Sequence, residues 1–314
     1  MKSWSEHPRA LAILKSDSCG RYMMSYLRQN NFKAAVFLAP LLLTISVLAQ
    51  TPSPTSTNLE QSKKELHEAA SAYREGNFSE AQLHSERALQ LDPQSQVAPF
   101  FIARTIHAQY KPGDRTPENE AKARAAIVAY QNVLLRFRTD DEAYKAIAYL
   151  YANLKEEELL RDWLLKRAAD VSVGPEKRAE AYAVLAAKDW DCSFKFTELP
   201  NNKSTTFDGQ KTTVSYLKPR DQSALTEAQR CATRGLQMSE MAIALETDSE
   251  SAWSYKANLL LELSKLAEMS GDVQQKTDRY KQYLEALAET TKLSEAAQKS
   301  QPRDGLRVFP VTVP

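Results

Sequence analysis

The stretch Leu66–Pro93, LHEAASAYREGNFSEAQLHSERALQLDP, predicts two short amphipathic helices joined by a tight turn. Small and apolar residues recur at helical spacing on both sides of Gly76, where the pattern breaks. Glycine readily takes a positive φ, so we expect the first helix to end there and Asp92-Pro93 to end the second. The two predicted apolar faces consist of Leu66, Ala69, Ala70 and Tyr73, then Phe78, Ala81, Ala88, Leu89 and Leu91.

A helix pair of this size cannot bury its apolar face alone, so it needs stacked neighbours. The spacing within the stretch resembles the tetratricopeptide repeat, and the resemblance covers roughly residues 60–298. It implies an all-α solenoid of about five antiparallel helix pairs. An ordinary helical hairpin in a globular bundle is the alternative. The residues that carry the resemblance are Gly76, Phe78, Ala81, Ala88, Leu91 and Pro93.

The later pairs follow the same pattern less completely. A shift of 34 residues moves Leu66, Ala69 and Tyr73 to Phe100, Ala103 and His107, inside a second helical stretch. The turn after that stretch is lengthened, and Thr139 stands where the repeat usually has a proline. Helices of the later pairs are predicted within residues 97–110, 121–137, 141–169, 182–191, 223–246 and 252–297.

Residues 192–221 differ in kind from the helical segments around them. Phe194–Thr197 and Thr213–Tyr216 alternate like strands, with turn signals at Pro200 and Asp208. We therefore expect a small β-hairpin or ordered loop inserted between two helices.

Residues 1–49 have the features of an N-terminal extension, residues 1–22, followed by a secretory signal segment. Arg28 and Lys33 precede an apolar run of about sixteen residues that ends in small residues at Ala49, where a signal peptidase would cut. The run contains Pro40 and is short for a membrane span. We expect an exported protein, periplasmic or secreted, without stable membrane insertion after cleavage; an uncleaved N-terminal anchor is the alternative.

The rest of the chain divides by composition. Residues 50–59 are a polar linker, 60–298 the repeat domain and 299–314 an extended tail. The whole chain has 41 basic and 40 acidic residues. Without the 49 leader residues, which carry six basic and two acidic residues, 35 basic and 38 acidic residues remain. This balance indicates no nucleic-acid partner.

Cleavage would also remove Cys19 and leave Cys192 and Cys231. An even pair of cysteines in an exported protein predicts one disulfide, and two buried thiols are the alternative.

No pattern of catalytic or metal-binding residues stands out. The four histidines, at positions 7, 67, 84 and 107, include no pair spaced for a helical zinc site. The scattered glycines form no phosphate loop, and no serine lies in a nucleophile elbow. The sequence therefore predicts a protein that is not an enzyme, without catalytic residues, metal or cofactor.

Proteins of the tetratricopeptide family generally bind peptides or partner helices in a groove lined by the first helix of each pair. The resemblance implies a protein or peptide partner here, and Arg104 and Lys145 would suit an acidic peptide with an apolar anchor. The alternative is that the aromatic residues form the core between repeats. The groove residues implied are Tyr73, Phe100, Arg104, His107, Lys145, Tyr149, Asn153, Trp190 and Asn258.

Two functions follow as hypotheses. The first is an exported, non-enzymatic scaffold of a bacterial cell envelope that binds a protein or peptide partner in the groove. The second is a small-molecule or glycan binder whose pocket is formed by the insertion at 192–221, with stacking faces from Trp190, Phe194, Phe196 and Tyr216.

Overall fold

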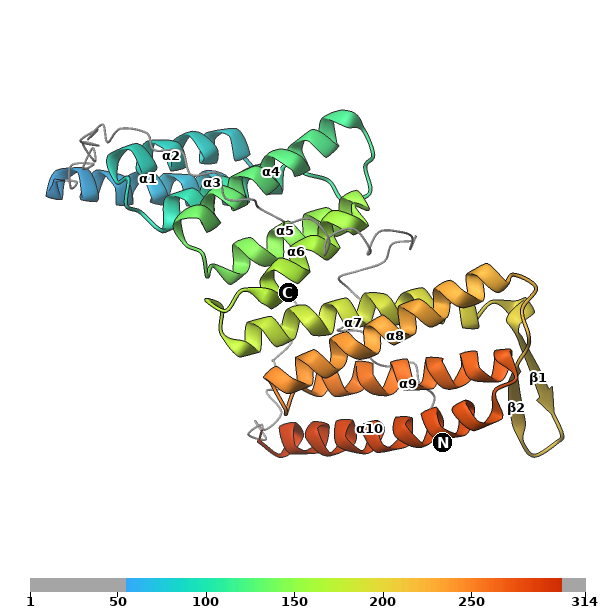
Figure 1. Cartoon of the computed structure of the whole chain (residues 1–314). Coiled ribbons are helices and arrows are strands. Elements are labelled where there is room, and N and C mark those ends of the chain that lie inside the picture. The colour runs from blue at the N-terminus through green and yellow to red at the C-terminus, as the bar shows by residue number, and fades with distance from the viewer. Residues whose placement is uncertain (1–54, 301–314) are drawn as a thin grey trace, which may run out of the picture. The chain divides into compact units, whose positions relative to one another are not determined.

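The computed structural model describes residues 55–300, in which ten α-helices and one β-hairpin form two compact units (Figure 1). The expected signal segment and the tail from residue 301 lie outside the described residues. Unit 1 ends at Glu157 and contains α1 (Ser56–Arg74), α2 (Phe78–Leu91), α3 (Val97–Ala108), α4 (Pro117–Arg136) and α5 (Asp141–Leu154). Unit 2 contains nearly all of α6 (Glu157–Ala169), then α7 (Pro175–Thr197), β1 (Lys203–Phe207), β2 (Thr212–Tyr216), α8 (Gln222–Leu245), α9 (Glu250–Ser270) and α10 (Val273–Ser300).

The first helix pair forms as the sequence predicts. Gly76 has a φ of +81° and joins α1 to α2, whose facing surfaces meet at small side chains. Ala69, Ala81 and Ala88 have no exposed surface, which allows the two helix backbones to approach closely. The buried hydroxyl of Ser62 on α1 donates a hydrogen bond of 3.0 Å to the Ala88 carbonyl on α2.

Helix α1 begins earlier than the apolar pattern indicates. The hydroxyl of Thr55 accepts a hydrogen bond from the backbone N–H of Asn58 and caps the helix. Residues 56–59, which we expected in the linker, are therefore helical. Serine, threonine and asparagine are common both in linkers and at helix starts, so composition alone could not separate the two.

In unit 1 each second helix also packs against the first helix of the next pair, so that α2 contacts α3 and α4 contacts α5. The longer connection between α3 and α4 is closed by Asn119. Its side chain accepts a hydrogen bond from Lys111 N and donates to the carbonyls of Lys111 and Asp114, at 2.8–2.9 Å. Asn119 is buried, and the lengthened turn is thus an ordered part of the repeat.

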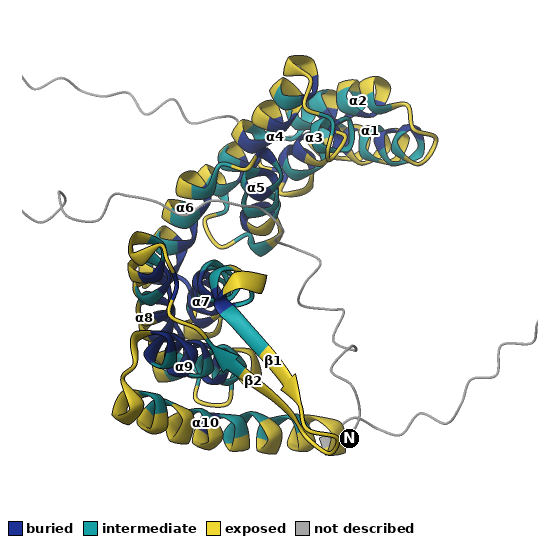
Figure 2. Ribbon diagram, turned by 90° about the vertical axis from the view of Figure 1, so that its right-hand side faces the viewer, coloured by how far each residue is buried: buried dark blue, intermediate teal, exposed yellow. Residues whose placement is uncertain are grey.

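Unit 2 has the same alternation, with α7 packed on α8, α8 on α9, and α9 on α10 (Figure 1). Gly271, in the left-handed region at a φ of +78°, ends α9. In Figure 2 the buried residues, drawn dark blue, are concentrated on α7, α8 and α9, while the residues of α10 are largely exposed. Both units confirm the predicted all-α fold with a small β insertion.

One local prediction was wrong. Phe194–Thr197 is not a strand but the last turn of α7, which continues without a break past Asp191. The ring of Phe194 stacks on Trp190 one helical turn earlier, at 4.9 Å between centroids, and Thr197 is fully buried. Four alternating residues fit the exposed and buried sides of a helix end as well as those of a strand, and packing on α9 selects the helix.

The β-hairpin occupies residues 203–216 of the predicted insertion. Lys203–Phe207 pairs antiparallel with Thr212–Tyr216, so that Lys203 faces Tyr216 at the base. Asp208 and Gly209 lie in the turn, as expected, and Gly209 has a φ of +93°. Figure 2 shows the base half-buried and the tip exposed. Only the base of the hairpin therefore packs against the helices.

A chain of charged groups holds that base. Lys265 of α9 donates to Glu262 at 2.7 Å and to Glu198 at 3.1 Å, and Glu198 also accepts from Tyr216 and Lys203. The Lys265 ammonium lies 5.2 Å from the Tyr216 ring centroid. Burial alone would lower the pKa of Lys265, but the carboxylates of Glu262 and Glu198 outweigh it and raise that pKa. The hairpin is thus attached through an ionised network.

Helices α7 and α8 are joined by the Cys192–Cys231 disulfide, with the two Cα atoms 6.1 Å apart. Beside it, buried Asp189 accepts hydrogen bonds from Arg161 and Arg234. A side chain at Gly235 would place Cβ 2.8 Å from Asp189 Cβ, so only glycine fits where α8 crosses α7. Cys192 is a residue of α7. We had expected it in the inserted segment, and that expectation was wrong.

Candidate functional site

A groove of about 520 Å3 opens in unit 1 along the first helices of three successive pairs. We call it the aromatic groove. It is lined by Tyr73 of α1, Phe100, Arg104, His107 and Ala108 of α3, Tyr110 of the following connection, Tyr130 of α4, and Glu142 and Ala146 of α5.

The repeat places these residues together. Tyr73 and His107 are 34 residues apart and occupy equivalent positions on α1 and α3. Helices α2 and α4 separate the first helices in sequence, and the 34-residue repeat places the same side of α1 and α3 at the groove. The periodicity of the sequence thus explains the surface shared by α1 and α3, whereas the side chains of α4 and α5 join it through packing.

Rings in edge-to-face and tilted contacts form the walls. Phe100 lies 5.8 Å from Tyr130, and Tyr73 contacts Phe101 at 5.6 Å between centroids. His107 is perpendicular to Tyr130 at 5.8 Å and tilted against Tyr149 at 5.7 Å. Contacts of this kind fix the positions of the rings, and each aromatic pair contributes about 0.5–1.5 kcal/mol beyond its buried area.

A neutral polar pair lies among these rings. His107 Nδ1 is 3.3 Å from the hydroxyl of Tyr130. Burial lowers the pKa of His107 and raises the pKa of the Tyr130 phenol. At neutral pH both groups are therefore uncharged and add no charge to the groove.

Charge enters the groove at two exposed side chains, Arg104 on α3 and Glu142 on α5. The Arg104 guanidinium lies 5.0 Å from the centroid of the Tyr73 ring. Within residues 55–300, no hydrogen bond or ion pair occupies the side chain of either residue. Both charges are therefore available to a ligand.

The other expected groove residues are distributed differently. Lys145 forms an ion pair with Asp141 at 3.1 Å, Tyr149 contacts His107, and Asn153 donates to the Tyr149 carbonyl within α5. These contacts make Lys145 a weaker candidate for an acidic ligand than Arg104. Trp190 and Asn258 belong to unit 2, where Trp190 packs on Phe194 and Tyr255.

Sequence reasoning missed five of the nine lining residues: Ala108, Tyr110, Tyr130, Glu142 and Ala146. The resemblance draws attention to the first helix of each pair, whereas Tyr130 reaches the groove from a second helix. Its hydroxyl was the available signal, because a buried phenol usually has a polar partner.

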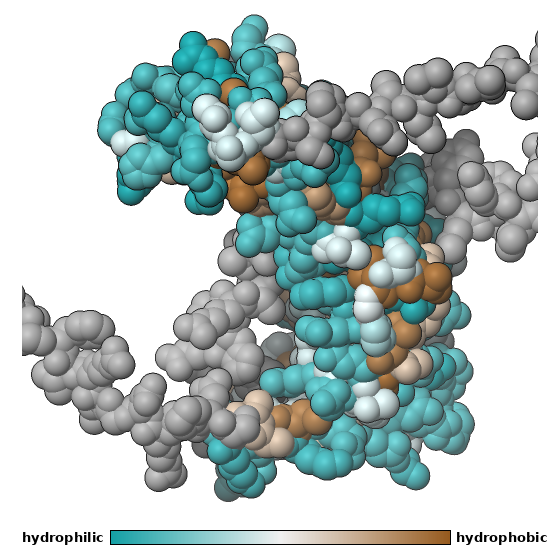
Figure 3. Space-filling view, turned by 90° about the vertical axis from the view of Figure 1, so that its left-hand side faces the viewer, coloured by the Kyte–Doolittle hydropathy of each residue, from teal (hydrophilic) through white to brown (hydrophobic). Residues whose placement is uncertain are grey.

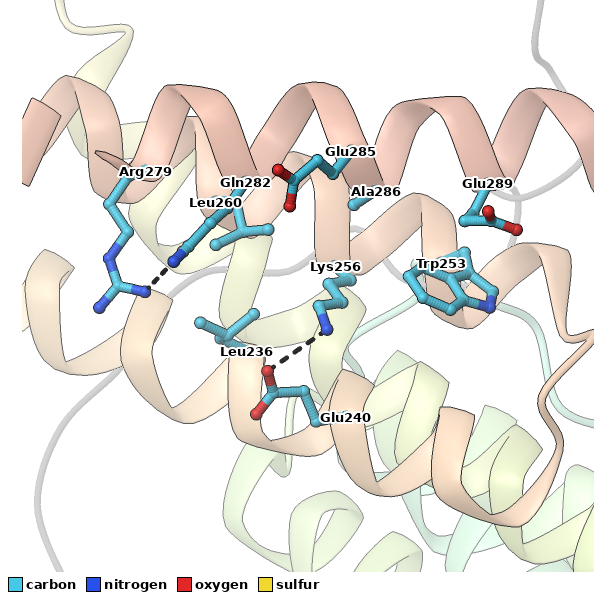
Figure 4. A pocket seen from close by; sticks show the side chains of 10 residues that line it. All are labelled: Leu236, Glu240, Trp253, Lys256, Leu260, Arg279, Gln282, Glu285, Ala286 and Glu289. Atoms are coloured by element: carbon cyan, nitrogen blue, oxygen red, sulfur yellow. Dashed lines mark hydrogen bonds and ion pairs between the residues drawn. The ribbon is translucent and has the colours of Figure 1, made fainter. Parts of the chain in front are cut away.

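A second hollow of about 450 Å3 lies in unit 2 among α8, α9 and α10 (Figure 4). Its cations already have partners. Lys256 lies 3.5 Å from Glu240 and 5.3 Å from the centroid of the Trp253 ring, and Arg279 donates to Gln282 at 3.1 Å. The aromatic groove is the stronger candidate because its walls are aromatic rings in mutual contact and, among the described residues, no hydrogen bond or ion pair occupies Arg104 or Glu142.

The aromatic rings expected to form a small-molecule site at 192–221 already contact other groups of the protein. Trp190 and Phe194 stack on each other, and the Lys265 ammonium lies over the rings of Phe194 and Tyr216. These contacts attach the hairpin to α7 and α9, which leaves Phe196, half-buried near the end of α7, as the remaining member of the expected set.

Among the described residues, Cys192, Glu227 and Cys231 form a group of metal-ligand types close together, and its two sulfurs are bonded to each other. No helix in residues 55–300 combines the length and hydropathy that crossing a bilayer requires. On the face seen in Figure 3, hydrophilic residues predominate and hydrophobic ones form separate patches.

No family model and no curated protein matches the sequence. Solved structures similar to the chain include MamA, at 11% identity and a TM-score of 0.35 over 80% of this chain and 99% of that one. YrrB, described as a TPR protein with an unusual peptide-binding site, has 10% identity and a TM-score of 0.31 over 78% and 95%. PilF of Pseudomonas aeruginosa has 14% identity and a TM-score of 0.30 over 78% and 100%.

The tetratricopeptide-like architecture is carried by the chain's own helix pairs. The predicted turn at Gly76, the equivalent positions of Tyr73 and His107, and the alternating packing of first and second helices all appear in the structure.

Proposed function

We propose that the protein is a non-enzymatic scaffold that binds an extended segment of a partner protein in the aromatic groove. One observation carries the proposal: an open groove combines fixed aromatic walls with an exposed Arg104 that has no anionic partner in residues 55–300. Aromatic residues and arginine contribute most of the binding energy in many protein interfaces.

The groove also suits an extended chain better than an enclosed small molecule. It is lined by residues of three successive first helices, α1, α3 and α5, and the half-buried His107 lies uncharged among its aromatic walls. An extended peptide presents backbone donors and acceptors along its length and side chains to alternate faces.

The test blocks the groove without removing any of its aromatic or charged side chains. Ala146 lines the groove and is half-buried, so Ala146→Trp should fill it. Ala125→Trp, at an exposed position on α4, is the matched control. Phage-displayed random peptides selected on the wild-type protein should bind the control variant equally and bind Ala146→Trp at least tenfold more weakly. Equal binding to all three proteins would contradict the proposal.

We further propose that the protein acts after export, in an oxidising compartment. The Cys192–Cys231 disulfide supports this, since such bonds persist mainly outside the reducing cytosol. Mass spectrometry of the protein from its native source should show a mature N-terminus at Gln50 and no alkylated cysteine before reduction. Two alkylated thiols would contradict it.

A further inference from the structure

The two unpaired charges of the aromatic groove differ in sign and lie on different helices. Arg104 is in the middle of α3, and Glu142 is in the first turn of α5. No ion pair joins them within residues 55–300, so they do not neutralise each other. The groove therefore has a positive side at α3 and a negative side at α5.

The two groups that lie between Arg104 and Glu142, His107 and Tyr130, carry no charge at neutral pH. His107 is neutral because burial lowers its pKa, and the Tyr130 phenol stays protonated because burial raises its pKa. Arg104 and Glu142 both act electrostatically on Tyr130, with opposite effects, so the phenol lies within reach of both charges.

Other charges near the groove are engaged. The carboxylate of Asp140 caps α5 by accepting a hydrogen bond from Ala143 N at 2.8 Å. Lys145 is paired with Asp141, and Arg115 with Glu120. Asp140 keeps its charge and acts on Tyr130 in the same direction as Glu142, so it adds to the negative side of the groove and does not balance it.

We infer that the aromatic groove recognises a segment of mixed charge, with an acidic side chain against Arg104, a basic side chain against Glu142, and an apolar or aromatic side chain between them. This inference rests on the proposed function and narrows its ligand. A uniformly acidic segment would meet repulsion at Glu142, and a uniformly basic one would meet it at Arg104.

The arrangement also determines the direction of the bound chain. A segment that reads acid, apolar, base can satisfy both charges in one direction only. Because charged pairs at an exposed rim contribute more to specificity and association rate than to affinity, the sign pattern should select direction more strongly than it strengthens binding.

The experiment uses phage-displayed random peptides selected separately on the wild type, Arg104→Glu, Glu142→Lys and the double variant. We expect wild-type selections to contain an acid and a base flanking an apolar residue. Arg104→Glu should replace the acid by a base, Glu142→Lys should replace the base by an acid, and the double variant should again select one acid and one base. Both positions are exposed, so the variants should fold, which thermal unfolding will verify.

A synthetic wild-type peptide should bind each single variant roughly three- to tenfold more weakly at low salt. A peptide with its two charges exchanged should recover wild-type affinity on the double variant. Suppose that peptides are enriched and that Ala146→Trp abolishes their binding. If those peptides show no preference for charged residues, or the same preference on the wild type and the charge variants, this inference is overturned and the proposed function stands. Selections without groove-dependent enrichment would overturn both.

Discussion

At the scale of single residues, His107 lines the groove and also makes the stability of the fold depend on pH. The imidazole is half-buried between the rings of Tyr130 and Tyr149, and burial lowers its pKa. In the unfolded chain the same group titrates near an ordinary value of about 6.5. As the pH falls below that value, the unfolded chain takes up a proton that the folded chain does not, and stability decreases.

We therefore predict that the wild type loses more stability than His107→Gln between about pH 7 and pH 5. Hydrogen exchange at α3 amides over this range measures the difference directly. His67→Gln, at an exposed position on α1, is the control and should follow the wild type. Parallel pH profiles for the wild type and His107→Gln would show that burial of the imidazole has no energetic consequence.

Lys155 is the one non-glycine residue with a positive φ among the described residues, at 59° after the end of α5. Glycine takes this conformation without the steric cost that a Cβ brings. Lys155→Gly should raise the free energy of unfolding by about 0.5–1 kcal/mol, and Gly271→Ala, at the equivalent position after α9, should lower it by about 1 kcal/mol. Urea unfolding of the two variants measures both effects, and the same sign in both would contradict the explanation.

How much of the site the sequence predicts depends on which helix supplies the residue. Tyr73, Phe100, Arg104 and His107 lie in the groove because a period of 34 residues repeats one surface on α1 and α3. Tyr130 and Glu142 depend on how far α4 and α5 turn relative to α3. That rotation is set by packing after a connection of irregular length, which periodicity does not encode.

At the scale of elements, the β-hairpin depends on two buried charges of α9. Glu262 and Lys265 are almost fully buried, and Thr197 donates a 2.6 Å hydrogen bond to the Glu262 carboxylate. Removing one member of a buried ion pair leaves an uncompensated charge, whereas removing both costs less.

Lys265→Met should therefore destabilise unit 2 by about 3–5 kcal/mol, and Lys265→Met combined with Glu262→Leu should lose less than the single variant. Thermal unfolding with hydrogen exchange of the hairpin amides follows both changes. A double variant less stable than the single one would mean that Glu262 supports the hairpin without Lys265.

The hairpin also shows where local sequence patterns are sufficient. Asp208 and Gly209 identify a turn from their own chemistry, and the structure has it there. Phe194 and Phe196 alternate in the same way as strand residues, yet contacts with Trp190 and α9 keep them helical. A turn is specified by two residues, whereas a short alternating segment takes the structure that its distant neighbours favour.

At the scale of the whole molecule, the two compact units differ in how they are held together. Unit 2 contains the Cys192–Cys231 disulfide, which closes a segment with a sequence separation of 39 residues, and unit 1 has no cysteine among its described residues. A crosslink of that length is expected to contribute about 4 kcal/mol by limiting the unfolded chain.

Reduction, or replacement of both cysteines by serine, should therefore accelerate hydrogen exchange in α7 and α8 and leave α1 to α4 unchanged. Peptide-resolved hydrogen exchange with and without reductant measures the two regions in one sample. An equal change in both units would mean that they unfold as one body.

Composition and periodicity were sufficient to predict the all-α class and the first helix pair, because that pair carries a glycine turn and a seam of small residues. The division of the chain into two units could not be predicted in this way. It arises from the sum of many weak contacts, and no single residue at positions 154–160 marks it.

Gly235 has a consequence for how this chain can change over evolutionary time. Its missing side chain lets α8 pass Asp189 and Leu259, four residues after the cysteine that joins α8 to α7. Inserting or deleting one residue between Cys231 and Gly235 would rotate Gly235 about the axis of α8 by about 100° relative to Cys231. A residue with a side chain would then lie where α8 crosses α7. Length variation among descendants of this protein should therefore accumulate at the tip of the hairpin and be absent from residues 231–235.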